Sequence, residues 1–198
     1  MMPRFHLVLA SQSPRRIQLL RQIGWDFEIV PSNLEEKWEP HWPPIETARQ
    51  LAVQKARDVA NHQLSRDVLI LAADTIVIID NKILGKPSTP DEAFAFLNRL
   101  SGRSHQVVTG VCLISPLHPQ PIVEDVMTCV WFSHLENQLI AEYIRAHTPF
   151  DKAGGYGIQD RGALFIERID GCFFNVMGLP LNRVYQMFKD NQLLRHLS

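Results

Sequence analysis

The sequence has 198 residues and a net charge of −1, from 20 Lys and Arg against 21 Asp and Glu. One domain over residues 1–198 is the expectation for this length, and 45% hydrophobic residues excludes a disordered chain. The balanced charge argues against a protein that coats DNA or RNA, but it leaves room for a local basic pocket that captures a small polyanion.

Cysteine usage and hydropathy indicate the compartment. Cys112, Cys129 and Cys172 are far apart and odd in number, so they predict neither a disulfide framework nor a zinc site. The apolar run at residues 7–10 is too short for the core of a signal peptide, and no later stretch is long enough to span a bilayer. We therefore expect a cytoplasmic protein that does not bind membranes.

Strand and helix patterns alternate along the chain, and tight turns join some strands, so we expect an α/β fold with a mixed sheet. Ser13 and Pro14 are typical of a helix start, and Gly24 is typical of a helix end. In chain order we expect a strand at 5–10, a helix at 14–23, a strand at 25–31, a helix at 44–61, strands at 68–80 and 83–84, a helix at 90–100, a hairpin at 104–115 and 122–132, a helix at 136–147, a glycine-rich loop at 148–162, strands at 164–169 and 173–176, and a helix at 181–194.

Lys55 interrupts the apolar face of the helix expected at 44–61. Apolar residues such as Ala52 and Ala56 recur there at spacings of three and four, and Lys55 lies in the middle of their stripe. Its stem could pack on the core while the ammonium reaches solvent. The alternative is a functional cation, because breaks in the pattern concentrate at functional sites.

Arg15 and Arg16 lie in the first turn of the helix expected at 14–23, where positive charge opposes the helix dipole. A bound phosphate would reconcile the two, because it would accept hydrogen bonds from the turn at 11–13 and from both guanidiniums. A solvated basic patch is the alternative.

Asp74 and Thr75 interrupt an otherwise continuous apolar run at 68–79. A lone carboxylate buried there is costly unless it is paired or bound to a metal. Capping a turn or pairing with a buried arginine would be a structural role. A metal ligand or a general base would be a functional one.

The segment at 151–162 contains four glycines, which let a backbone approach a ligand closely. It matches neither the Walker loop nor the GxGxxG dinucleotide fingerprint. A flexible surface loop is the alternative.

Blocks distributed over roughly the whole chain resemble the Maf family of nucleotide pyrophosphatases. Several ordered blocks are far more specific than one motif. They are ASQSPRR at 10–16, AADT at 72–75, LGKP at 84–87, LSGRSH at 100–105, DKAGGYGIQ at 151–159 and VMGLPL at 176–181.

This resemblance implies a reaction, a fold and a site. Members hydrolyse nucleoside triphosphates to the monophosphate and pyrophosphate with a divalent cation. Their fold is a mixed twisted sheet with flanking helices and two lobes around a central cleft, as in the inosine triphosphate pyrophosphatases. The site implied here comprises Asp74 as proton acceptor with Lys55 and Lys86 as catalytic residues, Ser11, Arg15, Arg16, Thr75 and Gln159 as substrate-binding residues, and Asp74 with Glu36 as ligands of Mg²⁺, Mn²⁺ or Co²⁺.

The block at 151–159 is similar to that of the branch acting on dTTP and UTP. Gln159 offers a donor and an acceptor to the imide edge of uracil or thymine. Asp160 and Arg161 depart from the family, where a glycine is common after the glutamine. The resemblance also implies a homodimer with a nucleotide substrate and no stable nucleic-acid partner. A nucleotide-sensing or nucleic-acid-binding regulator of cell division, without hydrolysis, is the alternative.

Overall fold

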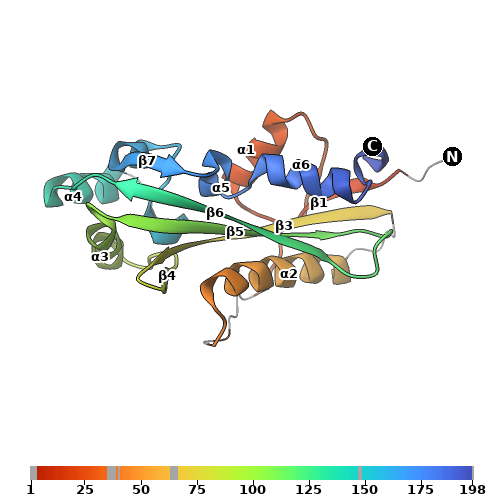
Figure 1. The fold of residues 1–198 in the computed structure, drawn as a ribbon, viewed down its shortest axis with the longest axis horizontal. Helices are drawn as coiled ribbons and strands as arrows, with labels where there is room; N and C mark the ends of the chain where they lie inside the picture. Colours follow the sequence, from red (N-terminus) through yellow and green to blue (C-terminus); the bar gives the residue numbers. More distant parts are fainter. Residues whose placement is uncertain (1–3, 35–38, 40, 63–66, 147–148, 198) are drawn as a thin grey trace. The chain divides into compact units, whose positions relative to one another are not determined.

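The computed structural model describes residues 4–34, 39, 41–62, 67–146 and 149–197. Strands of these residues form one sheet in which parallel and antiparallel pairs coexist (Figure 1). The strands are β1 (His6–Leu9), β2 (Glu28–Ile29), β3 (Val68–Ile79), β4 (Lys82–Leu84), β5 (Ser104–Ile114), β6 (Ile122–Phe132) and β7 (Ile166–Asp170).

The strand order is β2-β1-β3-β5-β6-β7, and β4 pairs with β3 outside this path. β1 is parallel to both β2 and β3, whereas the β3–β4 and β6–β7 pairs are antiparallel. The expected α/β class with a mixed sheet and flanking helices is confirmed.

The chain divides into two compact units, and the division falls within β3, β5 and β6. Unit 1 comprises Met1–Asp74, Thr109–Val126 and Gly178–Ser198, and unit 2 comprises Thr75–Val108 and Met127–Met177. No described helix is long and apolar enough to cross a membrane. Unit 1 holds α1 (Pro14–Gln22), α2 (Pro44–His62), α6 (Leu181–Asp190) and η4 (Leu194–His196), and unit 2 holds α3 (Pro90–Leu100), α4 (Asn137–Ala146), α5 (Phe173–Met177), η1 (Pro149–Asp151), η2 (Ala153–Gly155) and η3 (Arg161–Phe165).

In unit 1 the sheet is covered on both faces, with α2 on one side and α1 and α6 on the other (Figure 1). Small side chains bring α2 close to the strands. Ala52 and Ala56 are buried in one cluster with Ile70 of β3. Gly110 of β5 is essential to this closeness, because a Cβ there would lie 2.3 Å from the Ala48 carbonyl oxygen.

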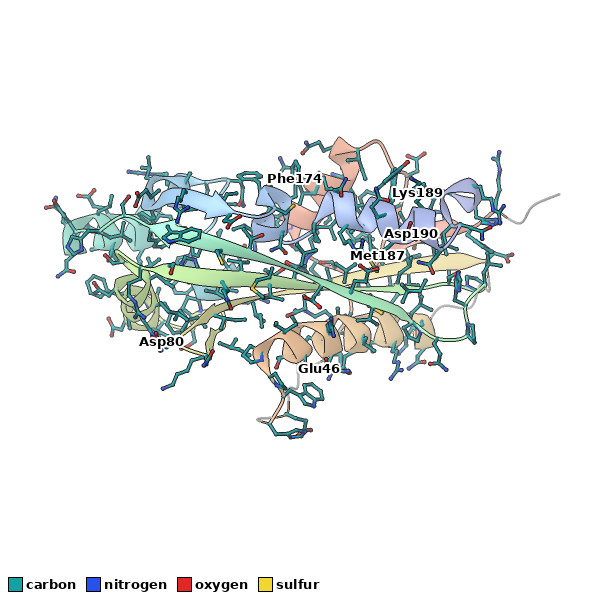
Figure 2. The ribbon with its side chains drawn as sticks, viewed as in Figure 1. Glu46, Asp80, Phe174, Met187, Lys189 and Asp190 are labelled. Carbon is teal, nitrogen blue, oxygen red and sulfur yellow. The ribbon has the colours of Figure 1, made fainter. Side chains whose placement is uncertain are left out.

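The helix α6 shows how apolar spacing sets orientation. Its buried residues recur at three- and four-residue intervals, as a helix with one core-facing stripe requires. Met187 is buried in that stripe, while Lys189 and Asp190 are exposed (Figure 2). The helix ends at Asp190 rather than at 194, and Gln192 beyond it has a left-handed φ of 58°.

In unit 2, α3 and α4 pack on a core rich in aromatic rings. Phe132 of β6 contacts the rings of Tyr156 and Phe165 edge-on, with centroids 4.7 Å and 5.8 Å away. Aromatic pairs in this arrangement contribute beyond the area they bury. The glycine-rich segment packs against this core through Tyr156, which lies within the segment, and Phe165, which follows it.

The turn from β3 to β4 follows the expected chemistry. Asp80 and Asn81 have left-handed φ values of 52° and 58°, which suit a two-residue hairpin turn. The Asp80 carboxylate (Figure 2) accepts hydrogen bonds from Arg103 and Arg99 at 2.5 Å and 3.0 Å. The bond from Arg103, followed by that from Arg99, lowers the pKa of Asp80 below its ordinary value.

Two expectations about secondary structure are wrong. The apolar run at 173–176 forms the helix α5 instead of a strand, because the Asn175 amide is fully buried and donates to the Val107 carbonyl and the Thr128 hydroxyl. The segment at 148–162 is not a structureless loop, since its described part contains η1 and η2 and the start of η3. The strand expected at 25–31 is reduced to the two residues of β2.

Candidate active site

Lys55 and Asp74 form an ion pair in unit 1. Lys55 Nζ on α2 lies 2.5 Å from Asp74 Oδ1 on β3. The two side chains are 15% and 9% exposed. The apolar face of α2 brings its lysine over β3, because the even-numbered residues Ile70 and Ala72 of β3 pack on α2 and Asp74 continues that side of the strand.

This pair resolves two of the alternatives left open by the sequence. The ammonium of Lys55 does not simply extend to solvent, and the Asp74 carboxylate is paired with this lysine. Buried carboxylates of this kind are retained when a cation and hydrogen bonds compensate for lost hydration. The pair is thus a stable anion–cation unit at the point where the apolar strand is interrupted.

Arg16 is a second buried cation of unit 1, at 9% exposure. Its Nε donates to the Gly178 carbonyl at 2.7 Å, and its Nη1 donates to Ser11 Oγ at 3.4 Å. The guanidinium therefore lies along the apolar side of α1, as the sequence indicates, and is fixed by the VMGLPL segment and by the turn before the helix. Arg15 beside it is half-buried.

The turn before α1 is closed differently from the expectation. Ser13 occupies the N-cap position, but its side chain makes no capping hydrogen bond. Instead Ser11 Oγ accepts the Ser13 N–H at 3.2 Å. Ser11, 7% exposed, thus bonds both the turn backbone and Arg16, which gathers two predicted phosphate-binding residues at one helix start.

The other predicted site residues lie in unit 2, apart from Glu36, which is outside the described residues. Thr75 is half-buried on β3 and, as the neighbour of Asp74, faces the opposite side of the strand. Lys86 and Gln159 are exposed, the first after β4 and the second between η2 and η3. Unit 1 therefore brings together Ser11 with Arg16 and Lys55 with Asp74.

The metal-binding expectation can be tested on donor chemistry. In the described part of the chain, no group of three or more His, Cys, Asp or Glu side chains is placed to hold an ion. Asp74 supplies one buried carboxylate, a hard oxygen donor. Magnesium is usually held by one or two carboxylates together with substrate phosphates rather than by an all-protein cage. Asp74 therefore suits a hard cation whose other ligands would include phosphate oxygens of a bound triphosphate.

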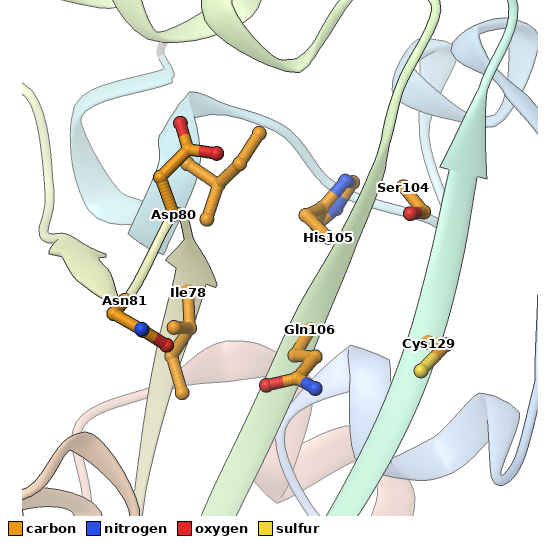
Figure 3. A pocket seen from close by; sticks show the side chains of 8 residues that line it. Ile78, Asp80, Asn81, Ser104, His105, Gln106 and Cys129 are labelled. Carbon is orange, nitrogen blue, oxygen red and sulfur yellow. The ribbon is translucent and has the colours of Figure 1, made fainter.

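Unit 2 contains a shallow cavity of about 250 Å³ lined by the end of β3, the start of β5 and Cys129 of β6 (Figure 3). None of the eight predicted site residues that the structure describes lines it. The polar lining of this cavity and the ion-paired Asp80 are not sufficient evidence that it binds a ligand. Its lining residues are Ile78, Ile79, Asp80, Asn81, Ser104, His105, Gln106 and Cys129.

Several residues that hold the glycine-rich segment were not predicted to have a role. Tyr156 is 5% exposed and His105 is 3% exposed, and a hydrogen bond joins them. Asp160 bonds the Gly162 amide and the Tyr143 hydroxyl. One signal was available: His105 alternates with the exposed Ser104 and Gln106 on β5, so it occupies a core-facing position.

Comparisons with known proteins agree with the resemblance seen in the sequence blocks between residues 10 and 181. The sequence model described as Maf-like protein matches residues 6–191. A protein named dTTP/UTP pyrophosphatase from Caldicellulosiruptor bescii is 47% identical over 185 residues, which are 92% of this chain and 93% of that protein. Another of that name, from Syntrophomonas wolfei, is 47% identical over 90% of this chain and 94% of its own length.

Among solved structures, the Staphylococcus aureus Ham1 protein is 17% identical and covers 64% of this chain and 71% of its own, with a TM-score of 0.44. That likeness is too weak to bear on function. The match of the sequence model over residues 6–191 and the 47% identity to full-length relatives establish the lineage: the chain belongs to the Maf family.

Proposed function

We propose that this protein is a nucleoside triphosphate pyrophosphatase that hydrolyses dTTP and UTP to the nucleoside monophosphate and pyrophosphate. The observation that carries this is the 47% identity, over more than nine-tenths of both chains, to proteins named dTTP/UTP pyrophosphatase. The buried Lys55–Asp74 pair supports it with a suitable acid–base group.

Asp74 acts on the attacking water in this proposal. Its carboxylate accepts a proton as the water oxygen bonds to the α-phosphorus, and the bond from that phosphorus to the bridging oxygen breaks. Pyrophosphate leaves and the nucleoside monophosphate keeps the α-phosphate. Lys55, 2.5 Å from Asp74 Oδ1, holds the carboxylate in place and offers its positive charge to the phosphates.

The cations of the site neutralise the triphosphate. Arg16 is oriented by Ser11 and by the Gly178 carbonyl, and a guanidinium with five donors can bond phosphate oxygens in addition to protein acceptors. Arg15 in the same helical turn, and Lys86 after β4, are the other cations that we assign to the phosphates.

Asp74 and Glu36 are the residues that would hold a divalent cation. Bound there with phosphate oxygens, Mg²⁺, Mn²⁺ or Co²⁺ would supply charge neutralisation at the transferring phosphorus. The acid that accompanies Asp74 is a proposal from the family resemblance, because Glu36 lies outside the described residues.

Selectivity for the base is assigned to Gln159, Thr75 and Arg15. The amide of Gln159 can donate and accept at once, which matches the imide edge of thymine and uracil. Gln159 is exposed on its loop and thus accessible to a ligand.

The location and the assembly are also proposals. The three cysteines are all free thiols, which supports a cytoplasmic location. A homodimer is the assembly that we propose.

The test is a product assay with purified protein. dTTP, UTP, CTP, dATP and dGTP are each incubated with Mg²⁺, Mn²⁺ or Co²⁺, and pyrophosphate, orthophosphate and nucleotides are quantified. We expect monophosphate and pyrophosphate in equal amounts from dTTP and UTP. Orthophosphate as the first product, or nucleotide binding without turnover under every metal, would refute the proposed reaction.

Asp74→Asn is the decisive variant, and it is expected to lose most of the activity while staying folded. Asp125→Asn is its matched control, because Asp125 of unit 1 is also partly buried, at 16% exposure, and paired with a cation, Arg49. Equal losses in both variants would indicate a general effect of removing a paired carboxylate.

A further inference from the structure

Tyr156 of the glycine-rich segment, three residues before the exposed Gln159, is anchored in the core of unit 2. Tyr156 is 5% exposed, and its hydroxyl lies 2.6 Å from Nε2 of His105, which is 3% exposed. Both rings also contact Phe132 edge-on. Side chains of two strands, His105 of β5 and Phe132 of β6, therefore contact the Tyr156 ring, and His105 also bonds its hydroxyl.

Packing alone does not explain why a histidine occupies position 105. Among the described residues its Nδ1 has no hydrogen-bond partner although it is buried. A phenylalanine would occupy similar space without this cost. The bond to the Tyr156 hydroxyl is a polar contact that an apolar ring at position 105 could not make. Burial also lowers the pKa of His105 to about 4, so the ring is neutral and its bond persists at physiological pH.

A second anchor follows Gln159 directly. Asp160 Oδ1 accepts the Gly162 N–H at 2.8 Å and the Tyr143 hydroxyl at 3.4 Å, and Lys152 Nζ lies 3.7 Å from Asp160 Oδ2. A Cβ on Gly157 would lie 2.5 Å from the same carboxylate, so the backbone closes tightly around it.

Gln159 is exposed between these two anchors, three residues after Tyr156 and one before Asp160. We propose that the His105–Tyr156 hydrogen bond positions Gln159 for base recognition, with Asp160 closing the other end of the loop. His105 and Tyr156 are positioning residues that act through the backbone from 156 to 160. This inference rests on the proposed function, because it concerns selection of the pyrimidine base in the same site.

The experiment compares Tyr156→Phe, His105→Phe and the double variant. The readout is the ratio of kcat/KM for dTTP to that for dATP. Each single variant is expected to lower this ratio by about tenfold, since small misplacements far from the chemistry have effects of that order or larger. The loss should fall mainly on KM for dTTP, because contacts to the base bind ground state and transition state alike.

The double variant separates positioning from stability. It replaces both polar partners by apolar rings, so its melting temperature should recover toward that of the wild type. The selectivity ratio should stay low, because the bond that orients the loop is still absent. Recovery of both quantities, or unchanged selectivity in the single variants, would overturn the proposal.

Ile140→Val is the matched control. Ile140 of α4 is fully buried in the same core as Tyr156 but lies outside the loop, so this variant loosens the core without touching the bond. It should lower the melting temperature and leave the selectivity ratio unchanged.

Hydrogen exchange of the ligand-free protein gives a readout that does not require turnover. Amides of the peptide at 157–162 should exchange faster in Tyr156→Phe than in the wild type or in Ile140→Val. If the wild type fails to hydrolyse dTTP, the proposed function fails, and this exchange result alone decides whether the pair holds the loop. If hydrolysis occurs and exchange is unchanged, only the positioning role fails.

Discussion

Replacing His105 by phenylalanine should remove a specific part of the acid sensitivity of this protein. Burial alone lowers the pKa of the imidazole from 6.5 to about 4 in the folded protein. Its ring neighbours are Phe132 and Tyr156, and burial also raises the pKa of the Tyr156 phenol, so this group stays neutral. The unfolded chain therefore binds a proton between these pH values that the native protein does not bind.

The size of the effect follows from the two pKa values. Their difference of roughly 2.5 units, at 1.36 kcal/mol per unit, corresponds to about 3 kcal/mol. Because the folded pKa is the lower one, this contribution is fully present above pH 6.5 and is lost as the pH falls to 4. Phenylalanine binds no proton in either state and shows no such loss.

The assay is urea unfolding of wild type and His105→Phe at pH 7, 6, 5 and 4. Asp80 and Glu92, whose pKa values are lowered by Arg103 and by the Ser88 backbone, destabilise both proteins equally on acidification. Their effect cancels in the difference between the two unfolding free energies. That difference should move by about 3 kcal/mol in favour of the variant between pH 7 and pH 4. A difference that is constant with pH would show that His105 is hydrated or protonated in the native state, and would refute the reasoning.

Three further substitutions test the geometry. Lys55→Met should destabilise the protein by about 3 kcal/mol in urea unfolding, because it removes the cation from a buried ion pair, and a loss under about 1 kcal/mol would mean that the pair is well hydrated. Gly110→Ala should cost about 1–3 kcal/mol or prevent folding, since its Cβ would overlap the Ala48 carbonyl, and a wild-type melting curve would contradict this approach of α2 to β5. Gly154→Ala should cost about 1–2 kcal/mol, because its φ of 69° is left-handed, and circular dichroism melts that match the wild type would argue against this backbone conformation.

The elements that the sequence predicted correctly depend on local chemistry. Pro90 and the Thr89 side chain, which accepts the Glu92 N–H, start α3 where the pattern indicates. Asp80 and Asn81 form the expected turn between β3 and β4. Such signals are effective because a cap or a turn is satisfied by residues within four positions of each other.

The failures come from contacts between residues distant in sequence. The run at 173–176 has the composition of a strand, yet the buried amide of Asn175 reaches Val107 and Thr128, 68 and 47 residues away. A hydropathy pattern does not contain those partners. Tertiary hydrogen bonds overrode local propensity there.

For the candidate site, the sequence likewise indicated the residues but not the contacts between them. Lys55 and Asp74 were visible in the sequence as polar interruptions of apolar stripes, because a charge in a buried position is costly wherever it occurs. Their partnership at 2.5 Å was not visible, since it depends on how α2 lies on β3. His105 and Tyr156, 51 residues apart, were likewise joined only by the fold.

The amino-acid sequence by itself determined the α/β class, most element positions, the family and the residue types of the site, including a basic group within a chain whose net charge is −1. Only the tertiary structure decided which charges meet and that the side chains of His105 and Tyr156 are in contact. Periodicity records which side of an element is buried, whereas a hydrogen bond requires two groups within about 3 Å, a condition that only the folded chain satisfies.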